Sequence, residues 1–207
     1  MEQIKNKNLT MILIGIGIVI FMSTLDSSIV TVALPVLSKA LNTNISLINW
    51  VVTMYLIVMS STLMIFGKLG DKYGKIKFFK WGTLLFVVSS ALCALSVSWV
   101  TLIISRSLQA IGAAMTMATS NGIIVEVFPD SRRGQALGWM GSFVSLGGII
   151  GPSIGGILLN FFPWHIIFWL NVPIGVIAIF LLFRYLPNKL DQKYANRGFD
   201  LTGSVLL

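Results

Sequence analysis

Six apolar stretches, each long enough to cross a bilayer as a helix, leave this sequence little room for any other fold. A helix needs about 20 apolar residues to cross about 30 Å of hydrocarbon. The chain of 207 residues is 56% hydrophobic and only 11% charged, whereas a soluble domain carries about 25% charged residues. We therefore expect an all-α membrane protein. The predicted spans are 9–35, 47–66, 79–98, 101–125, 136–158 and 166–186.

The predicted organisation follows from the same pattern. We expect residues 1–186 to form an N-terminal six-helix bundle. The polar and basic segment 187–200 predicts a cytoplasmic linker. A further apolar stretch begins at Leu201, so residues 201–207 are interpreted as the start of a truncated seventh helix.

Basic residues predict the orientation of the spans. With the N-terminus inside, all of the 15 Lys and Arg residues fall in cytoplasmic segments except Lys39 and Arg106. Cytoplasmic loops of membrane proteins carry such an excess of Lys and Arg. The net charge of +8 is therefore attributed to these loops rather than to nucleic-acid binding. We expect a multi-pass protein of the cytoplasmic membrane with a cytoplasmic N-terminus.

Two charged side chains lie well inside the predicted spans, Asp26 in the first and Arg106 in the fourth. A charge near the bilayer centre costs roughly 2.5–3.5 kcal/mol or more, so such residues usually face a bundle interior or a water-filled path. Counted along the helices, Asp26 lies about 12 Å and Arg106 about 8 Å below the outer face. The two can therefore meet if their helices are neighbours. One interpretation is a structural pair that fixes helix orientation; the other is a proton or cation site on a transport path.

A stripe on the fourth span extends this hypothesis. Arg106, Gln109, Ala113 and Met117 share one side of a helix at a spacing of three to four residues. We place Gln109 and Met117 on the proton or substrate path with Asp26 and Arg106. We hypothesise that Asp26 exchanges a proton as its environment alternates between the two sides of the membrane, or binds a cationic substrate in competition with that proton.

The fifth span carries a series of glycines with one proline. Glycines let another helix approach closely and proline can bend a helix, so the series is either a static packing seam or one that bends during transport. The segment GPSIG at 151–155 also matches the G-x-S-x-G pattern of serine hydrolases, but no strand precedes it. We therefore expect no enzyme. The series consists of Gly138, Gly147, Gly151, Pro152, Gly155 and Gly156.

The segment GKLGDKYGKIK at 67–77 predicts a tight cytoplasmic turn. It is rich in Gly and Lys but lacks the G-x-x-x-x-G-K-[ST] pattern of a phosphate-binding loop. At the inner end of the fourth span, Glu126 lies near Arg132 and Arg133 in the sequence, and we expect it to extend its carboxylate to the membrane interface.

Taken in order, five motifs resemble those of the major facilitator superfamily, and more narrowly its drug:proton antiporters with fourteen transmembrane helices. Some positions depart from the family pattern: Ser28 and Thr31 replace the more usual Thr and Asn, Lys72 and Lys75 replace Arg, and Ala110 replaces Gly. The motifs are LDSSIVTVALP at 25–35, GKLGDKYGKIK at 67–77, LIISRSLQAIGAA at 102–114, the glycine series of 138–156, and WHIIFWLNVPIG at 164–175.

The resemblance implies alternating access between two helical bundles, driven by proton influx. It implies that Arg106 takes part in proton coupling, that the glycine series marks an exporter, and that substrates are lipophilic or cationic drugs. It also implies that the loop between the second and third helices helps to lock the outward-facing state. The residues of that loop gate are Gly67, Asp71, Lys72, Gly74 and Lys75.

The leading prediction is therefore proton-coupled drug efflux, with this chain as the N-terminal half. Its expected partners are the lipid bilayer, a lipophilic small molecule and a second half of six or eight helices, with the proton as coupling ion, no other cofactor and no metal. The alternatives are a metabolite uniporter or importer, and a non-transporting membrane subunit or truncated product.

Overall fold

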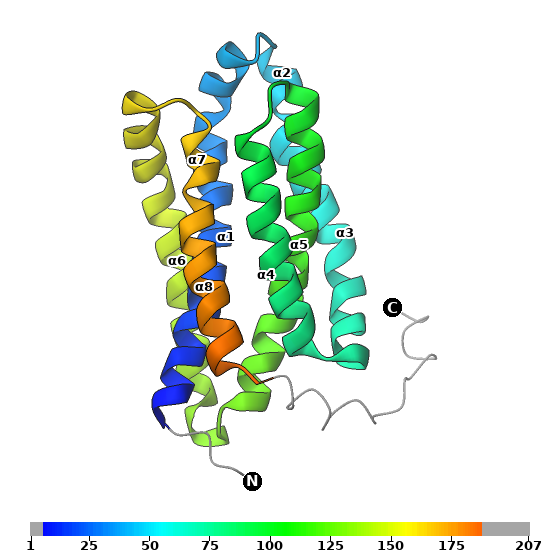
Figure 1. Ribbon diagram of the computed structural model, residues 1–207, viewed down its shortest axis with the longest axis vertical. Coiled ribbons are helices and arrows are strands. Elements are labelled where there is room, and N and C mark those ends of the chain that lie inside the picture. Colours follow the sequence, from blue (N-terminus) through cyan, green and yellow to red (C-terminus); the bar gives the residue numbers. More distant parts are fainter. Residues whose placement is uncertain (1–5, 188–207) are drawn as a thin grey trace.

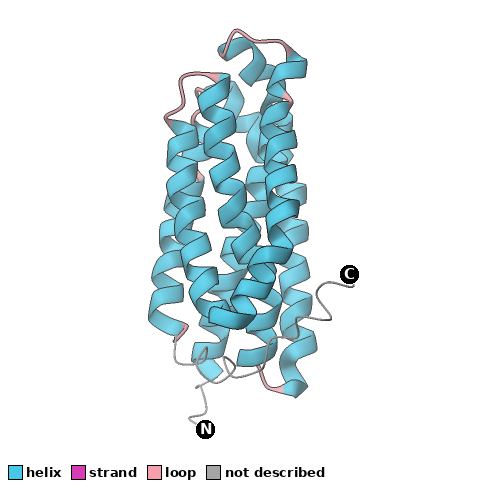
Figure 2. Cartoon of the chain, turned by 90° about the vertical axis from the view of Figure 1, so that its right-hand side faces the viewer, coloured by secondary structure: helices cyan, strands magenta, loops and turns pink. Residues whose placement is uncertain are grey.

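The computed structural model describes residues 6–187, which form helices and short connections only. The predicted linker 187–200 and seventh helix fall outside the described residues, apart from Pro187. Six helical segments are long and apolar enough to cross a membrane, as predicted. The helices run alongside one another in one bundle (Figures 1 and 2). Their bounds are α1 Asn6–Ala40, α2 Ile45–Ile48, α3 Trp50–Tyr73, α4 Lys75–Ala94, α5 Trp99–Val127, α6 Asp130–Phe161, α7 Ile166–Trp169 and α8 Asn171–Tyr185.

Local signals in the sequence set several helix ends. Ser98 begins α5 with a capping box, in which its side chain accepts from the Thr101 amide and the Thr101 side chain accepts from the Ser98 amide. Pro129 precedes the first residue of α6, where its missing N–H donor does no harm. In α1 the helix continues past Pro35 to Ala40, so the first helix is longer than the predicted apolar stretch.

The predicted turn at 67–77 is reduced to a single residue. Gly74 lies between α3 and α4 with φ 110°, a left-handed value that only glycine adopts readily. The remaining residues of that segment belong to the last turns of α3 and the first turn of α4. At the other end of the bundle, each connection between spans has four residues: 41–44, 95–98 and 162–165.

The helices pack in an order that differs from their order in the chain. α5 lies between α3 and α4, α1 packs along α6, and α8 packs on α1 and α4. Backbone contact brings α4 and α5 together, because a Cβ on Gly112 would lie 2.8 Å from the carbonyl oxygen of Gly82. The spans that contain α3 and α6 are the least covered: 11% and 17% of their most apolar windows are buried, against 50% for α1 and α5.

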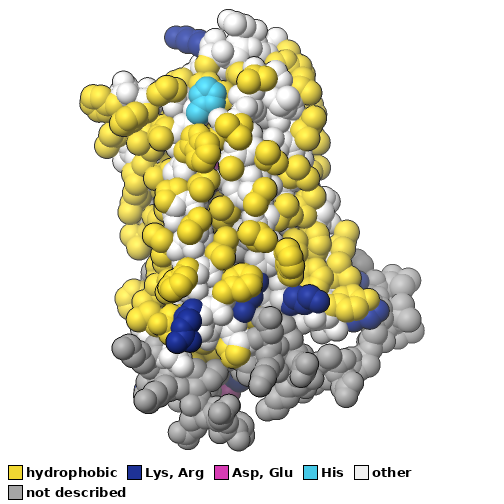
Figure 3. Space-filling view, in the orientation of Figure 1, with side chains coloured by type: hydrophobic (Ala, Val, Ile, Leu, Met, Phe, Trp, Pro, Cys, Tyr) yellow, Lys and Arg dark blue, Asp and Glu magenta, His cyan; other side chains and the backbone are white. Residues whose placement is uncertain are grey.

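Basic side chains gather at the end of the bundle where α1 begins, which we call the basic end (Figure 3). One of them, Lys80, is buried, and its Nζ donates to the Leu186 carbonyl at 2.6 Å. It thereby satisfies an orphan carbonyl at the C-terminal end of α8. Lys39, in the last turn of α1, lies at the opposite end. The described basic residues at the basic end also include Lys68, Lys72, Lys75, Lys77, Arg132, Arg133 and Arg184.

Candidate functional site

An ion pair is buried in the middle of the bundle, between Asp26 on α1 and Arg106 on α5. Each residue is 1% exposed. Arg106 Nη1 donates to Asp26 Oδ2 and also to Gln109 Oε1, the latter at 2.6 Å. Asp26 and Arg106, which the sequence placed at similar depths in the membrane, are therefore in direct contact.

Two amides complete the surroundings of the carboxylate. Gln109 Nε2 donates to Asp26 Oδ1 at 3.2 Å and to Ser90 Oγ at 2.7 Å. Asn171, the first residue of α8, donates from Nδ2 to the same Oδ1 at 2.6 Å. Asp26 therefore accepts hydrogen bonds from three side chains on two helices, α5 and α8. Asn171 was not among the predicted site residues, although an Asn within a predicted apolar span is itself a signal.

Aromatic rings enclose the guanidinium. Arg106 Cζ lies 4.0 Å from the centre of the Tyr55 ring on α3 and 5.8 Å from that of Phe168 on α7. Such cation–π contacts strengthen when they are removed from water. Arg106 Nε and Asn171 Oδ1 are buried and make no hydrogen bond among the described residues.

Met117 does not join this group. Met117 lies on the same side of α5 as Arg106, but it is 11 residues farther along the chain, about 16 Å along the helix. Its side chain is 46% exposed, whereas Ala113 on the same stripe is fully buried. The structure thus brings together Asp26, Arg106 and Gln109 but not Met117.

A second ionic cluster ties three helices together at the basic end. Lys75, the first residue of α4, binds Asp71 of α3 at 3.0 Å and Glu126 of α5. Glu126 thus pairs with Lys75 on α4, a partner that its place in the sequence did not indicate. Gly122 makes room for this contact, since a Cβ there would lie 2.6 Å from Lys75 Cδ.

The other residues of the predicted loop gate differ in their surroundings. Gly74 forms the turn itself. Gly67 has no atom within 4 Å of where its Cβ would lie. The ammonium group of Lys72 lies 5.1 Å from the centre of the neighbouring Tyr73 ring.

The glycine series of α6 divides between two faces. A Cβ on Gly147 would lie 2.1 Å from Thr24 Oγ1, and a Cβ on Gly151 would lie 1.8 Å from Ser28 Oγ. α6 therefore contacts α1 at residues that precede and follow Asp26 in the sequence. Ser28 Oγ also lies 3.1 Å from the Gly147 carbonyl oxygen. Gly155 packs against α1 as well, whereas Gly138 and Gly156 face open space. Pro152 is exposed and lies inside α6 without ending it.

Comparison with known proteins identifies the family. The family model described as Major Facilitator Superfamily matches residues 16–206. The chain belongs to the major facilitator superfamily. The superfamily and the six-helix fold expected from the sequence are therefore confirmed, and this family consists of transporters.

Three curated relatives of this major facilitator chain have names that refer to transport or to drug and antibiotic resistance. It is 44% identical to the riboflavin transporter RibZ of Clostridioides difficile, 31% identical to multidrug resistance protein 3 of Bacillus subtilis and 36% identical to the methylenomycin A resistance protein of Streptomyces coelicolor. The matches cover 98%, 98% and 80% of this chain. They cover only 44%, 39% and 35% of the relatives, so the chain spans less than half of their length.

The fold matches solved transporters at low sequence identity. A bacterial homologue of the human lysosomal transporter Spinster, in an inward-facing and occupied conformation, superposes with a TM-score of 0.77 at 15% identity. The match covers 93% of this chain and 47% of that structure. The likeness shows the fold: this bundle is equivalent to about half of such a transporter.

Proposed function

We propose that this chain is the N-terminal half of a proton-coupled exporter of lipophilic or cationic small molecules. The observation that carries the proposal is the buried Asp26–Arg106 pair, in which a titratable carboxylate joins three helices inside an apolar bundle. Charged residues inside membrane spans commonly form proton relays or ion pathways. The names of the multidrug and methylenomycin resistance relatives support export of foreign compounds.

The geometry gives protonation a direct effect on helix packing. A proton on Asp26 neutralises the carboxylate and weakens the bonds from Arg106, Gln109 and Asn171 together. Arg106 keeps Gln109 Oε1 and the Tyr55 ring as partners, so the guanidinium stays with α5. Protonation therefore weakens the hydrogen bonds that join α1 to α5 and α8. A substrate cation that approaches the carboxylate competes with the same proton.

The basic end is proposed to face the cytoplasm. Its excess of Lys and Arg satisfies the charge rule for cytoplasmic segments (Figure 3). In this orientation the chain lies in the cytoplasmic membrane with its N-terminus inside. The cluster of Asp71, Lys75 and Glu126 then fastens α3, α4 and α5 at the cytoplasmic side, where a loop gate would act.

Alternating access requires a second half of six or eight helices. We propose that it covers the exposed sides of α3 and α6, whose apolar windows are the least buried in this bundle. The open glycine face of α6, which includes Gly138 and Gly156, permits close approach of another helix. We propose no enzymatic activity, because GPSIG lies in the interior of α6 and forms no strand-to-helix elbow.

A metabolite carrier is the second candidate. The 44% identity to a riboflavin transporter exceeds that to either resistance protein, so a planar aromatic metabolite is a specific alternative substrate. Transport without a proton gradient would identify a uniporter. A third alternative is a membrane subunit that transports nothing by itself.

Proteoliposomes test these alternatives. The chain alone and a form completed with a second half are reconstituted, and ethidium and riboflavin fluxes are followed with and without an imposed pH gradient. Gradient-driven ethidium flux from the completed form, abolished by Asp26→Asn, is the expected result. Riboflavin flux without ethidium flux would favour the metabolite carrier. Unchanged gradient-driven transport by the Asp26→Asn variant would refute proton coupling through this carboxylate.

A further inference from the structure

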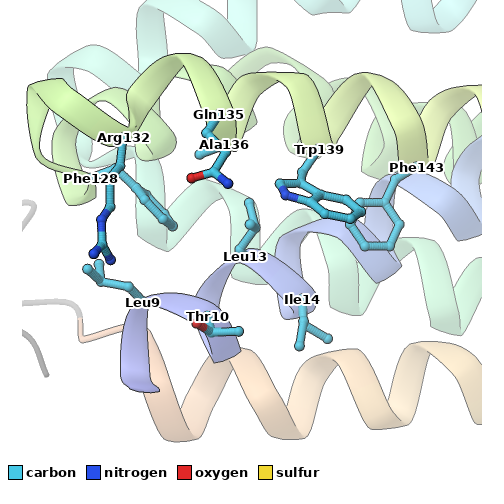
Figure 4. Close-up of a pocket in the computed structure, with 10 residues that line it drawn as sticks. All are labelled: Leu9, Thr10, Leu13, Ile14, Phe128, Arg132, Gln135, Ala136, Trp139 and Phe143. Carbon is cyan, nitrogen blue, oxygen red and sulfur yellow. The ribbon is translucent and has the colours of Figure 1, made fainter. Parts of the chain in front are cut away.

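A groove lies between α1 and α6 at the basic end, separate from the buried ion pair. Its volume is about 330 Å³, at the lower end of the range for ligand pockets. Asp26 is 12 residues beyond Ile14 of the groove, about 18 Å along α1. The residues that line it are Leu9, Thr10, Leu13, Ile14, Phe128, Arg132, Gln135, Ala136, Trp139 and Phe143 (Figure 4).

The groove results from a change in side-chain size along the α1–α6 contact. Nearer the opposite end, Gly147 and Gly151 let the two backbones touch. The next contact toward the basic end is the Phe143 ring, which fills the space beside Gly17 so fully that a Cβ there would lie 2.3 Å from the ring. Toward the basic end the lining side chains from α1 and α6 are larger than these glycines, and the groove lies among them.

The lining has a polar end and an apolar body. In Figure 4, Arg132 reaches from α6 toward Leu9 at the end of the groove, while Trp139 and Phe143 lie farther along it. Thr10 and Gln135 add polar groups from α1 and α6. Trp139 is 52% exposed, and an exposed indole at this level is typical of the membrane interface. The groove thus combines one positive charge at the membrane surface with apolar walls directed into the bilayer.

We infer that this groove binds one anionic phospholipid from the adjacent leaflet, with the phosphate at Arg132 and an acyl chain along Leu13, Ile14 and Phe143. Basic pockets between membrane helices on the cytoplasmic side bind anionic headgroups, and a guanidinium matches phosphate oxygens through paired N–H donors. The apolar walls select a lipid over free phosphate. Assignment to the cytoplasmic leaflet rests on the orientation in the proposed function; the binding itself does not.

Native mass spectrometry of the purified 207-residue chain tests the inference. The chain is released from nanodiscs made of equal parts dioleoyl phosphatidylglycerol and dioleoyl phosphatidylcholine, and the lipid retained on each chain is counted. We expect one phosphatidylglycerol, retained about fivefold in preference to phosphatidylcholine, the ratio expected for one nearby cationic side chain. Arg132→Gln should abolish the preference. Lys68→Gln removes a charge from α3 and should leave the preference unchanged.

Two further measurements separate lipid binding from general charge attraction. Ile14→Trp fills the groove from α1 and keeps every charge, so it should release the bound phosphatidylglycerol. Glycerol 1-phosphate, which has the headgroup charge without an acyl chain, should not displace the lipid. Equal retention of both lipids by the unmodified chain, an unaltered preference in Arg132→Gln, or displacement by glycerol 1-phosphate would overturn the inference. Because no transport is measured, failure of the proposed exporter function would not change these results.

Discussion

The substitution Asp26→Asn tests how strongly the buried pair holds the bundle. An Asn side chain at this position keeps an oxygen toward Gln109 and Asn171 but turns its NH₂ group toward Arg106 Nη1, so two donors face each other. Arg106 would remain buried, at 1% exposure, without its counter-charge. Breaking a buried ion pair from one side costs about 3–5 kcal/mol. Arg106 keeps its hydrogen bond to Gln109 and its contact with Tyr55. We therefore expect the unfolding free energy to fall by about 3 kcal/mol, the lower end of this range.

The matched double variant removes both charges. In Asp26→Asn with Arg106→Met, the amide oxygen still accepts from the two neighbouring amides and no unpaired charge remains. Replacement of both partners of a buried pair is often close to neutral, so we expect the double variant to be more stable than either single variant. Unfolding in mixed micelles with increasing SDS, followed by circular dichroism, gives the free energies for a double-mutant cycle. Additive losses, or an Asp26→Asn loss below about 1 kcal/mol, would refute the energetic role assigned to the pair.

Three further predictions concern other contacts, each measured by the same unfolding titration. Gly151→Ala should lower the unfolding free energy by about 1–3 kcal/mol, because the added methyl group overpacks against α1. Gly138 faces open space, so Gly138→Ala should raise the unfolding free energy by about 0.5–1 kcal/mol. Equal effects of the two substitutions would contradict the division of the α6 glycines between two faces. Asn171→Ala should lower the unfolding free energy by about 1.5–3 kcal/mol, because the hydrogen bond to the Asp26 carboxylate is lost. The control Asn121→Ala, at an exposed position, should change the unfolding free energy by less than about 0.5 kcal/mol. Similar losses at both sites would argue against the Asn171 contact. Glu126→Gln should cost about 1.5 kcal/mol by weakening the bond to its cationic partner on α4, and an unchanged midpoint would show that this contact is absent in the folded protein.

The pairing of Asp26 with Arg106 could be predicted because charges are rare inside membrane spans. Asp26 and Arg106 are the two charged side chains well inside the predicted spans, and counting residues along the helices places them at similar depths. The helical stripe that carries Arg106 also brings Gln109 into contact with Asp26. Met117, on the same stripe, is exposed, because periodicity gives the direction of a side chain but not which neighbouring helix covers it. The assignment of both residues to a transport path stays a prediction.

The partners that escaped prediction depend on packing between distant segments. Asn171 reaches Asp26 across 145 residues, and nothing in the local sequence of either segment specifies that α8 lies against α1. Glu126 is close in sequence to two arginines, yet Lys75 on α4 binds it. The order of helix neighbours decides such contacts, and that order could not be derived from hydropathy and charge alone.

The single-residue connection at Gly74 has a mechanical consequence for the bundle. The chain advances only 3.8 Å between successive Cα atoms, so one residue gives α3 no slack with which to slide along α4. Any change in the angle between these two helices must pivot at the basic end. The connections at the opposite end have four residues each and constrain the spacing of the helices that they join less tightly. We therefore expect any motion of α3 relative to α4 to be a swing about Gly74, with the largest displacement at the opposite end of the bundle.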